Sequence, residues 1–228
     1  MLECLRAHKR TTHRLYVLHN AKGLGALLNA AAGLPVEECT RHELDALVNG
    51  TVHQGVVLEA DPLPLYAVNA WLASHAQPDA IVVALDGVED PRNFGAIVRS
   101  AAAFGVRAVL FAKDRAAPLS PAAVKSAAGG MEYVDLIQAA NLVRALDAFR
   151  KAEYWAAALE ADAPQALWQA DLTGRLVLVV GAEGKGIRRL VREHCDFHLR
   201  IPLTGPIPSL NASVSAAIAL AECARQRA

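Results

Sequence analysis

Short apolar runs alternate with helix-like segments from residue 80 onward. The apolar runs have strand length, and they span residues 80–85, 108–113, 133–137, 154–160, 175–181 and 198–203. Helices are expected from Asn93 and near residues 121–129, 139–151, 186–194 and 211–226. Strands that are apolar on both faces and alternate with helices indicate a parallel sheet that helices cover on both sides. We therefore expect an α/β fold.

A smaller α/β unit is expected before this sheet. Strands are predicted at 14–20 and 54–60, with a helix around 23–32 between them. The segment DPLPLY, at 61–66, contains two prolines and interrupts regular structure. The expected divisions are a first domain, a linker and a second domain, at residues 1–60, 61–79 and 80–228.

Three loops of the second domain each end a strand and open a helix. They read DGVEDPRN at 86–93, GAEGKG at 181–186 and TGPIPSLN at 204–211. In open parallel sheets, ligands bind outside the carboxyl ends of the strands. Loops that leave these ends can converge on one pocket, so we expect the functional site there.

The GAEGKG loop has three glycines but no standard nucleotide motif. Its spacing is not GxGxxG, and Ile187 stands where a P-loop needs Ser or Thr for magnesium. Glycines let a ligand approach the backbone closely, and the N–H groups that open the next helix favour negative partial charge. Glu183 in this loop is either a cap of that helix or a polar anchor in a site.

Polar side chains on the third loop and on the helix after the first loop also have two interpretations each. Ser209 and Asn211 are both good N-cap residues, and only one of them can be the cap, so the other is a spare hydrogen-bonding group. Arg99 lies on an apolar helix beside the small residues Gly95 and Ala96. Such an arginine either runs its stem along apolar surface to water or occupies a site that its small neighbours leave open.

Charge limits the classes of function. The chain has 23 Lys and Arg against 23 Asp and Glu, so its net charge is zero. This balance argues against a protein that coats nucleic acid by bulk attraction. Two local basic clusters remain, and each is either a solvated helix face or a contact for an acidic partner. The clusters contain Arg6, Lys9, Arg10, Arg14 and Lys22 in one case, and Lys185, Arg188, Arg189 and Arg192 in the other.

Hydropathy and cysteine spacing indicate the compartment. No apolar run approaches the ~18 residues of a membrane-spanning helix, and basic residues interrupt the start, unlike a signal peptide. The four cysteines are scattered, with no CxxC pair, and are expected as reduced thiols. We therefore expect a cytoplasmic protein with no membrane segment. The stretch HCDFH, at 194–198, matches no standard zinc spacing, so no metal is expected.

The three loops carry motifs that resemble the SpoU family of RNA ribose 2′-O-methyltransferases. NFGAIVRSAAAFGV resembles the first family motif, LVLVVGAEGKGI the second, and IPLTGPIPSLNASVSAAIAL the third. The resemblance covers about residues 80–228, in the family's order and spacing. The first domain, with VHQGVV at 52–57, resembles the substrate-binding domain of bacterial enzymes that methylate a guanosine of 23S rRNA.

This resemblance implies a fold and an assembly. The second domain is expected to carry the carboxyl-terminal trefoil knot of the SPOUT class, an exception to unknotted chain connections. The family members are homodimers in which residues of both subunits complete the site. Related chains begin with a short strand and a Gly-containing turn before the helix that contains Met1, which leaves open whether Met1 is the true start.

The resemblance also implies site residues. The family's catalytic positions match Asn93, Arg99, Glu183, Ser209 and Asn211, with Arg99 as the catalytic residue. Its S-adenosylmethionine positions, which bind mostly through backbone, match Gly181, Ile201 and Leu210, with Gly186 and Ser213 beside them. In the first domain, the residues expected to contact RNA are Arg6, Lys9, Arg10 and Arg14.

The implied reaction is methyl transfer from S-adenosylmethionine to a ribose 2′-hydroxyl, a group that only RNA carries. The expected substrate is a guanosine of 23S rRNA, and a tRNA is the alternative. Arg99 acts either as a base or as a phosphate clamp, and the clamp is favoured because guanidinium groups in general are too weakly acidic to serve as bases. A non-catalytic RNA-binding protein would not need Asn93, Arg99 and Glu183, and a nucleotide-dependent oxidoreductase would need the missing glycine pattern.

Overall fold

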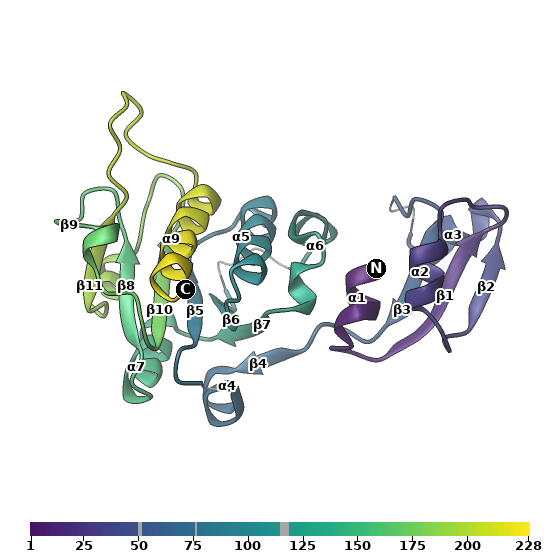
Figure 1. The fold of residues 1–228 in the computed structure, drawn as a ribbon, viewed down its shortest axis with the longest axis horizontal. Coiled ribbons are helices and arrows are strands. Elements are labelled where there is room, and N and C mark those ends of the chain that lie inside the picture. Colours follow the sequence, from purple (N-terminus) through teal and green to yellow (C-terminus); the bar gives the residue numbers. More distant parts are fainter. Residues whose placement is uncertain (50–51, 76, 115–118) are drawn as a thin grey trace. The chain divides into compact units, whose positions relative to one another are not determined.

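The computed structural model describes residues 1–49, 52–75, 77–114 and 119–228. The chain divides into two compact units, Met1–Pro64 and Leu65–Ala228, here called unit 1 and unit 2 (Figure 1). Each unit has its own sheet and its own cluster of buried apolar residues.

Unit 1 contains a three-stranded sheet of order β2-β1-β3, in which β2 is parallel and β3 antiparallel to β1. Its core joins Leu15 and Val17 of the central strand to Leu5, Ala31 and Val56. The elements in chain order are α1 (Leu2–Ala7), β1 (Thr12–Leu18), α2 (Gly25–Ala30), β2 (Val36–Cys39), α3 (Arg41–Leu47) and β3 (Val56–Ala60).

The hydrophobic pattern did not predict β2 and α3. β2 reads VEEC and is exposed at all but its last residue, so it lacks the apolar alternation of a half-buried strand. α3 begins at a capping box, in which Thr40 Oγ1 accepts the Glu43 N–H at 3.3 Å and Glu43 Oε2 accepts the Thr40 N–H at 2.7 Å. The T-x-x-E spacing is a sequence signal for a helix start, so this helix was predictable.

Unit 2 is built on an eight-stranded parallel sheet of order β4-β7-β6-β5-β10-β8-β11-β9. β5 and β6 are buried at every residue, which confirms the prediction of a sheet covered on both faces. The six predicted strands are present, and β4 and β9 are added at the edges. The strands are β4 (Leu65–Ala67), β5 (Ile81–Asp86), β6 (Ala108–Ala112), β7 (Asp135–Ala139), β8 (Trp155–Leu159), β9 (Gln165–Ala166), β10 (Leu176–Gly181) and β11 (Phe197–Arg200).

Helices cover both faces of this sheet. Figure 1 shows α5, α6 and α9 on one face and α4 and α7 on the other. The helices are α4 (Val68–His75), α5 (Pro91–Ala103), α6 (Pro121–Ala127), α7 (Leu142–Lys151), α8 (Arg189–Arg192) and α9 (Ala212–Gln226). Within the described ranges, no helix is both long and apolar enough to cross a membrane. The trefoil knot stays a prediction from the family resemblance.

Two helix starts differ from the prediction. α5 begins at Pro91 rather than Asn93, because Asp90 caps it by accepting the Arg92 N–H at 2.8 Å, and proline suits the first helical position. α8 has only four residues instead of 186–194. The backbone of Gly186, with a φ of 62°, lies outside the helical region and delays the helix start.

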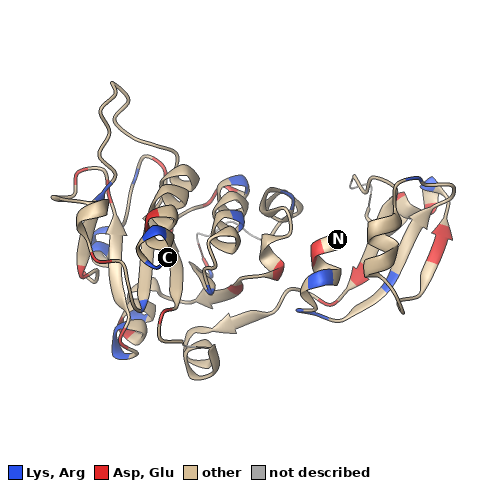
Figure 2. Cartoon of the chain, viewed as in Figure 1, with Lys and Arg blue, Asp and Glu red and all other residues tan. Residues whose placement is uncertain are grey.

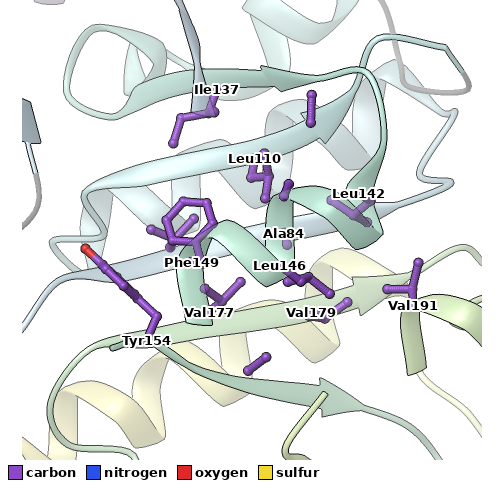
Figure 3. Packing of buried hydrophobic residues seen from close by; sticks show 14 of the residues in the cluster. Ala84, Leu110, Ile137, Leu142, Leu146, Phe149, Tyr154, Val177, Val179 and Val191 are labelled. Carbon is purple, nitrogen blue, oxygen red and sulfur yellow. The ribbon is translucent and has the colours of Figure 1, made fainter. Parts of the chain in front are cut away.

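The segment expected as a linker, 61–79, holds two elements that belong to unit 2. β4 pairs with β7, and Trp71 of α4 is fully buried in the core, where its Nε1 donates to Asp135 Oδ2 at 2.9 Å. The same core contains Phe149 and Leu146 of α7, which Figure 3 shows packed near Val177 of β10. The prolines thus interrupt the chain only before Leu65, and the apolar residues after them join the sheet.

Candidate active site

Two of the three predicted loops leave neighbouring strands in the middle of the sheet. β5 ends at Asp86 and β10 ends at Gly181, and these two residues are paired in the parallel register. The loop after Asp86 leads into α5, and the loop after Gly181 leads to α8. The third loop follows β11 and leads into α9.

Three polar side chains, one from each loop, meet at this end of the sheet. Asn93 Nδ2 donates to Glu183 Oε1 at 3.1 Å. Asn211 Nδ2 donates to Asn93 Oδ1 at 3.1 Å and also donates to Glu183 Oε1. The structure therefore joins three of the five predicted catalytic residues, Asn93, Glu183 and Asn211, in one hydrogen-bonded group, here called the polar cluster.

The polar cluster decides between the alternatives left by the sequence. Asn211 is the cap of α9, because its Oδ1 accepts the Ser213 N–H at 2.8 Å, yet its Nδ2 also belongs to the cluster. One side chain thus fills both roles that we expected to be separate. Glu183 caps no helix, since α8 has Arg188 at its N-cap and no side-chain cap bond. Ser209 is left as the spare hydroxyl.

The GAEGKG loop folds into a tight hairpin. The N–H of Ala182 donates to Gly186 O at 3.2 Å, and the N–H of Gly186 donates to Ala182 O at 2.9 Å. A Cβ on Gly181 would lie 2.3 Å from the Gly186 carbonyl carbon, and Gly184 has a φ of 75°. The space beside Gly181 is therefore filled by the loop's own backbone, whereas we expected the glycines of this loop to leave room for a ligand.

A pocket of about 840 Å³ lies beside the polar cluster. Of the residues predicted to bind the cofactor, Gly181, Gly186, Ile201 and Leu210 line this pocket, and of the predicted catalytic residues, Glu183, Ser209 and Asn211 do. Ser213 does not line it, and its hydroxyl donates to Asn211 Oδ1 at 2.6 Å. Asn93 lines an adjoining hollow of about 280 Å³ that shares Glu183 and Gly186 with the pocket.

The sequence interpretation missed an acid on the pocket wall. Glu160 follows β8, lines the pocket and is largely buried, with 11% of its side chain exposed. Its carboxylate accepts from Arg192 Nε at 3.0 Å and bonds with His198 Nδ1 at 2.9 Å. Its position after an apolar strand, at the ligand-binding end of the sheet, was the signal that could have identified it.

Arg99 lies outside the polar cluster and the pocket. Its side chain on α5 is exposed and has no hydrogen bond or ion pair within the part of the chain that the structure describes. Gly95, which we expected to leave space near Arg99, serves a packing role instead. A Cβ on Gly95 would lie 2.3 Å from Ala123 O and 2.6 Å from Ser126 Cβ, so glycine is required for close contact between α5 and α6.

The basic residues of unit 1 are interspersed with acids, as Figure 2 shows. Arg6 Nη1 bonds with Glu3 Oε1 at 3.1 Å, and Arg14 Nη1 bonds with Glu37 Oε2 at 2.6 Å. The Glu37 bond raises the pKa of Arg14 above its ordinary value. Arg10 donates to the Asp61 carbonyl at 2.8 Å. Arg6 and Arg14, both predicted to bind RNA, are thus paired with carboxylates in the free protein.

The second basic cluster also has acidic partners. Arg188 pairs with Asp86, Arg189 with Glu193 and Arg192 with Glu160. In the neighbouring HCDFH stretch, Cys195 donates to Val191 O at 3.3 Å. Among the described residues, no group of three or more His, Cys, Asp and Glu side chains is arranged to hold a metal ion.

Comparison with known proteins identifies the family of both units. Residues 80–221 match the SpoU rRNA Methylase family, and residues 1–66 match the family described as RNA 2′-O ribose methyltransferase substrate binding. The 23S rRNA (guanosine-2′-O-)-methyltransferase RlmB of Pseudomonas aeruginosa is 41% identical over 230 residues, which cover 98% of this chain and 92% of that protein. RlmB of Escherichia coli K12 is 43% identical over 198 residues, which cover 86% and 81%.

Solved structures share this fold. The SpoU methyltransferase AviRb from Streptomyces viridochromogenes, in complex with the cofactor AdoMet, aligns with a TM-score of 0.80 at 21% identity, covering 99% of this chain and 87% of that one. The sequence matches extend over both units, and the motif loops converge at one end of the parallel sheet. The chain therefore belongs to the SpoU rRNA Methylase family.

Proposed function

We propose that this protein transfers a methyl group from S-adenosylmethionine to the ribose 2′-hydroxyl of a guanosine in 23S rRNA. The observation that carries the proposal is the meeting of Asn93, Glu183 and Asn211 beside a large pocket at the carboxyl end of a parallel sheet. Relatives named for this reaction are 41% and 43% identical to the chain. The four cysteines are free, which supports the cytoplasm as the place of action.

The pocket suits S-adenosylmethionine in size and lining. Its volume of about 840 Å³ is large enough for a nucleoside joined to an amino acid. Ile201 and Leu210 supply apolar surface, and the backbone of the loop from Gly181 to Gly186 supplies close polar contacts without long side chains. When bound, S-adenosylmethionine supplies an electrophilic methyl group on its sulfonium.

The polar cluster and Arg99 have separate roles in the proposed reaction. Asn93, Glu183 and Asn211 hold one another through hydrogen bonds and present a preorganised polar wall that orients the ribose. The exposed guanidinium of Arg99 binds the phosphate next to the reacting hydroxyl and stabilises the developing alkoxide. A guanidinium is a poor base, because its pKa exceeds ~12.

A second copy of the chain completes the proposed active form. Val214 and Ile218 lie four residues apart on α9 and are 45% and 36% exposed, so this helix keeps an apolar strip outside its own core. Arg99 lies outside the pocket of its own chain. A homodimer would cover the strip and would let Arg99 of one subunit serve the pocket of the other.

Unit 1 is proposed to bind the RNA substrate. It matches a substrate-binding family over residues 1–66, and the residues expected to reach RNA are Arg6, Lys9, Arg10 and Arg14. Arg6 and Arg14 would exchange their carboxylate partners for phosphates on binding. Phosphate contacts of this kind supply affinity and orientation rather than sequence selectivity.

Mapping of ribose methylation tests the proposed function. RNA from cells with and without the protein is compared at every nucleotide, and the purified protein is titrated with S-adenosylmethionine and with NAD by calorimetry. In cells without the protein, we expect one 23S rRNA guanosine to lack its ribose methyl group. In the titration, we expect the purified protein to bind S-adenosylmethionine but not NAD. Loss of methylation in a tRNA would establish the alternative substrate, and an unchanged methylation map would favour a non-catalytic RNA-binding protein.

A further inference from the structure

Asp86 is a buried carboxylate at the end of a strand that is otherwise apolar. It is 1% exposed and ends β5, whose other residues read IVVAL. Its Oδ2 accepts the backbone N–H of Arg188 at 2.7 Å, and its Oδ1 accepts from Arg188 Nε at 2.6 Å. A buried charge is retained in a fold only when it is paired and hydrogen-bonded. Among the described residues, Arg188 supplies the hydrogen bonds and the ion pair of the Asp86 side chain.

These bonds tie both ends of the GAEGKG loop to one residue. The loop starts at Gly181, which is the sheet partner of Asp86, and Arg188 follows two residues after Gly186. The hairpin between them is closed by the two backbone bonds of Ala182 and Gly186. Asp86 therefore determines where the chain leaves the hairpin, in addition to where it enters.

The shape of this hairpin determines the site. Its backbone forms a wall of the large pocket, and Glu183 at its tip bonds with Asn93 and Asn211. We propose that Asp86 and Arg188 are positioning residues that hold the loop in the shape that binds S-adenosylmethionine and presents Glu183 to the polar cluster. This inference rests on the proposed placement of S-adenosylmethionine in the pocket.

The same pairing has a second consequence for Arg188. Its guanidinium is about half exposed, with 47% of the side chain accessible, and the buried Asp86 holds it by its Nε and Nη2 atoms. An arginine held in this way is oriented toward the sheet. Arg188 is therefore assigned to the loop rather than to the RNA-binding surface.

Unit 2 offers a matched control pair with the same chemistry at another place. Asp196 Oδ2 accepts the Ala156 N–H at 2.8 Å, and its Oδ1 accepts from Arg150 Nη2 at 3.2 Å. Like Asp86, Asp196 is a poorly exposed aspartate that accepts one backbone N–H and one arginine. It precedes β11 at the amino end of that strand, and neither Asp196 nor Arg150 lines the pocket.

The test compares Asp86→Asn with Asp196→Asn in the full chain. An asparagine keeps the size of the side chain, but its amide nitrogen cannot accept a hydrogen bond. Thermal unfolding and calorimetric titration with S-adenosylmethionine are measured for both variants. We expect both to unfold at a lower temperature, but only Asp86→Asn to lose affinity for S-adenosylmethionine, by at least tenfold. Its KM for S-adenosylmethionine should rise in step, whereas its KM for RNA should stay unchanged.

Arg188→Gln keeps the inference testable if Asp86→Asn does not fold. In this variant residue 188 keeps the backbone N–H that donates a hydrogen bond to Asp86. Only the half-exposed guanidinium is removed. It should weaken S-adenosylmethionine binding, and Arg188→Lys should recover part of the loss. Gly181→Ala provides the positive control, because its Cβ would collide with Gly186 and open the hairpin.

The outcomes separate this inference from the proposed function. Wild-type affinity in Asp86→Asn and Arg188→Gln, with weak binding by Gly181→Ala, would overturn the role of the Asp86–Arg188 pair alone. Wild-type affinity in all three variants would show that the cofactor does not use this loop. Equal losses of affinity in Asp86→Asn and Asp196→Asn would show that general destabilisation causes the loss, and would overturn the positioning role.

Discussion

Asn211 illustrates, at the residue scale, how one side chain joins folding to function. Its oxygen caps α9 and its nitrogen donates to the polar cluster, so the position of the helix and the position of the amide depend on each other. An amide is the side chain that carries an acceptor and donors on one rigid group. The N-cap preference alone is shared by Ser, Thr and Asp, and the second role explains why asparagine is suited to this place.

Arg99→Ala tests the proposed phosphate contact. Arg99 is exposed and makes no polar contact among the described residues, so removal of its side chain should leave the unfolding temperature and S-adenosylmethionine affinity nearly unchanged. Turnover should fall by about 10²-fold, as expected for a lost transition-state contact. Single-turnover methylation of an RNA transcript measures this loss. Arg144→Ala, which removes another exposed arginine of unit 2, should keep full activity.

Arg99→Lys distinguishes the clamp from the base. An ammonium cannot copy the planar grip of a guanidinium on phosphate, so a clamp predicts low activity at every pH. A base predicts that activity recovers as the pH rises toward the lysine pKa. Full activity of Arg99→Ala would contradict both roles.

At the element scale, α9 has one buried face and one exposed apolar strip. Ala216, Ala219 and Leu220 are fully buried, whereas Val214 and Ile218 are not. Small residues on the inner face allow close packing, and Figure 1 shows α9 beside α5. The outer strip is what a partner subunit would bury.

Ile218→Lys should convert the proposed dimer into a monomer. A lysine placed in an apolar interface would lose hydration without gaining a partner. Sedimentation at micromolar concentration should show the change, and turnover should fall while the helix content stays constant. Val124→Lys on α6 replaces another exposed apolar residue, 46% accessible, and should remain dimeric. A wild-type chain that is monomeric and active would rule out the dimer.

The burial of two cysteines predicts that the folded protein loses stability at high pH. Burial raises the pKa of the Cys195 thiol to about 12 and that of the Cys223 thiol to about 11. Above pH ~9 the unfolded chain loses these thiol protons and the folded chain keeps them, so the free energy of unfolding should fall as the pH rises. Urea titrations at pH 7 and pH 10 measure this trend. Neither thiol should react with iodoacetamide at pH 8 before urea is added.

At the scale of the whole molecule, a neutral chain is proposed to bind a polyanion. Unit 1 carries its basic side chains next to acids, so its affinity for RNA depends on exchange of ion-pair partners as well as on counterion release. Arg14 is the clearest case, because Glu37 holds it at 2.6 Å. Such ion pairs reduce the nonspecific attraction of RNA to unit 1. The arginines would orient toward RNA phosphates only in the bound state.

Replacement of Arg6, Lys9, Arg10 and Arg14 by Gln should weaken RNA binding and flatten its salt dependence. The change in slope should be reduced by the existing ion pairs, because Glu3 and Glu37 already pair with Arg6 and Arg14 in the free protein. Glu37→Gln should act in the opposite direction and strengthen binding. Filter binding across a salt series measures both effects, and S-adenosylmethionine affinity is the control. An unchanged slope in the fourfold variant would place the RNA elsewhere.

The sequence by itself determined the class of fold and which polar residues lie near the carboxyl ends of the strands. Strands such as β5 and β6 carry no polar alternation, which predicts burial on both faces, and their alternation with helices is typical of a parallel sheet between helices. The motif loops follow β5, β10 and β11, so Glu183 and Asn211 were predictable as residues of the ligand-binding edge. Local signals also explain α3, whose capping box was present in the sequence.

Only the tertiary structure decided which of these residues meet and which remain apart. Asn93 lies 90 residues from Glu183 and 118 from Asn211, and their contact depends on β10 lying beside β5 in the sheet. Helix and strand periodicity describes neighbours a few residues apart, so it contains no information on strand order. Gly95 must be glycine because α6 packs closely against it, and Arg188, the partner of Asp86, lies 102 residues further along the chain. Contacts of this range arise only when the sheet is assembled.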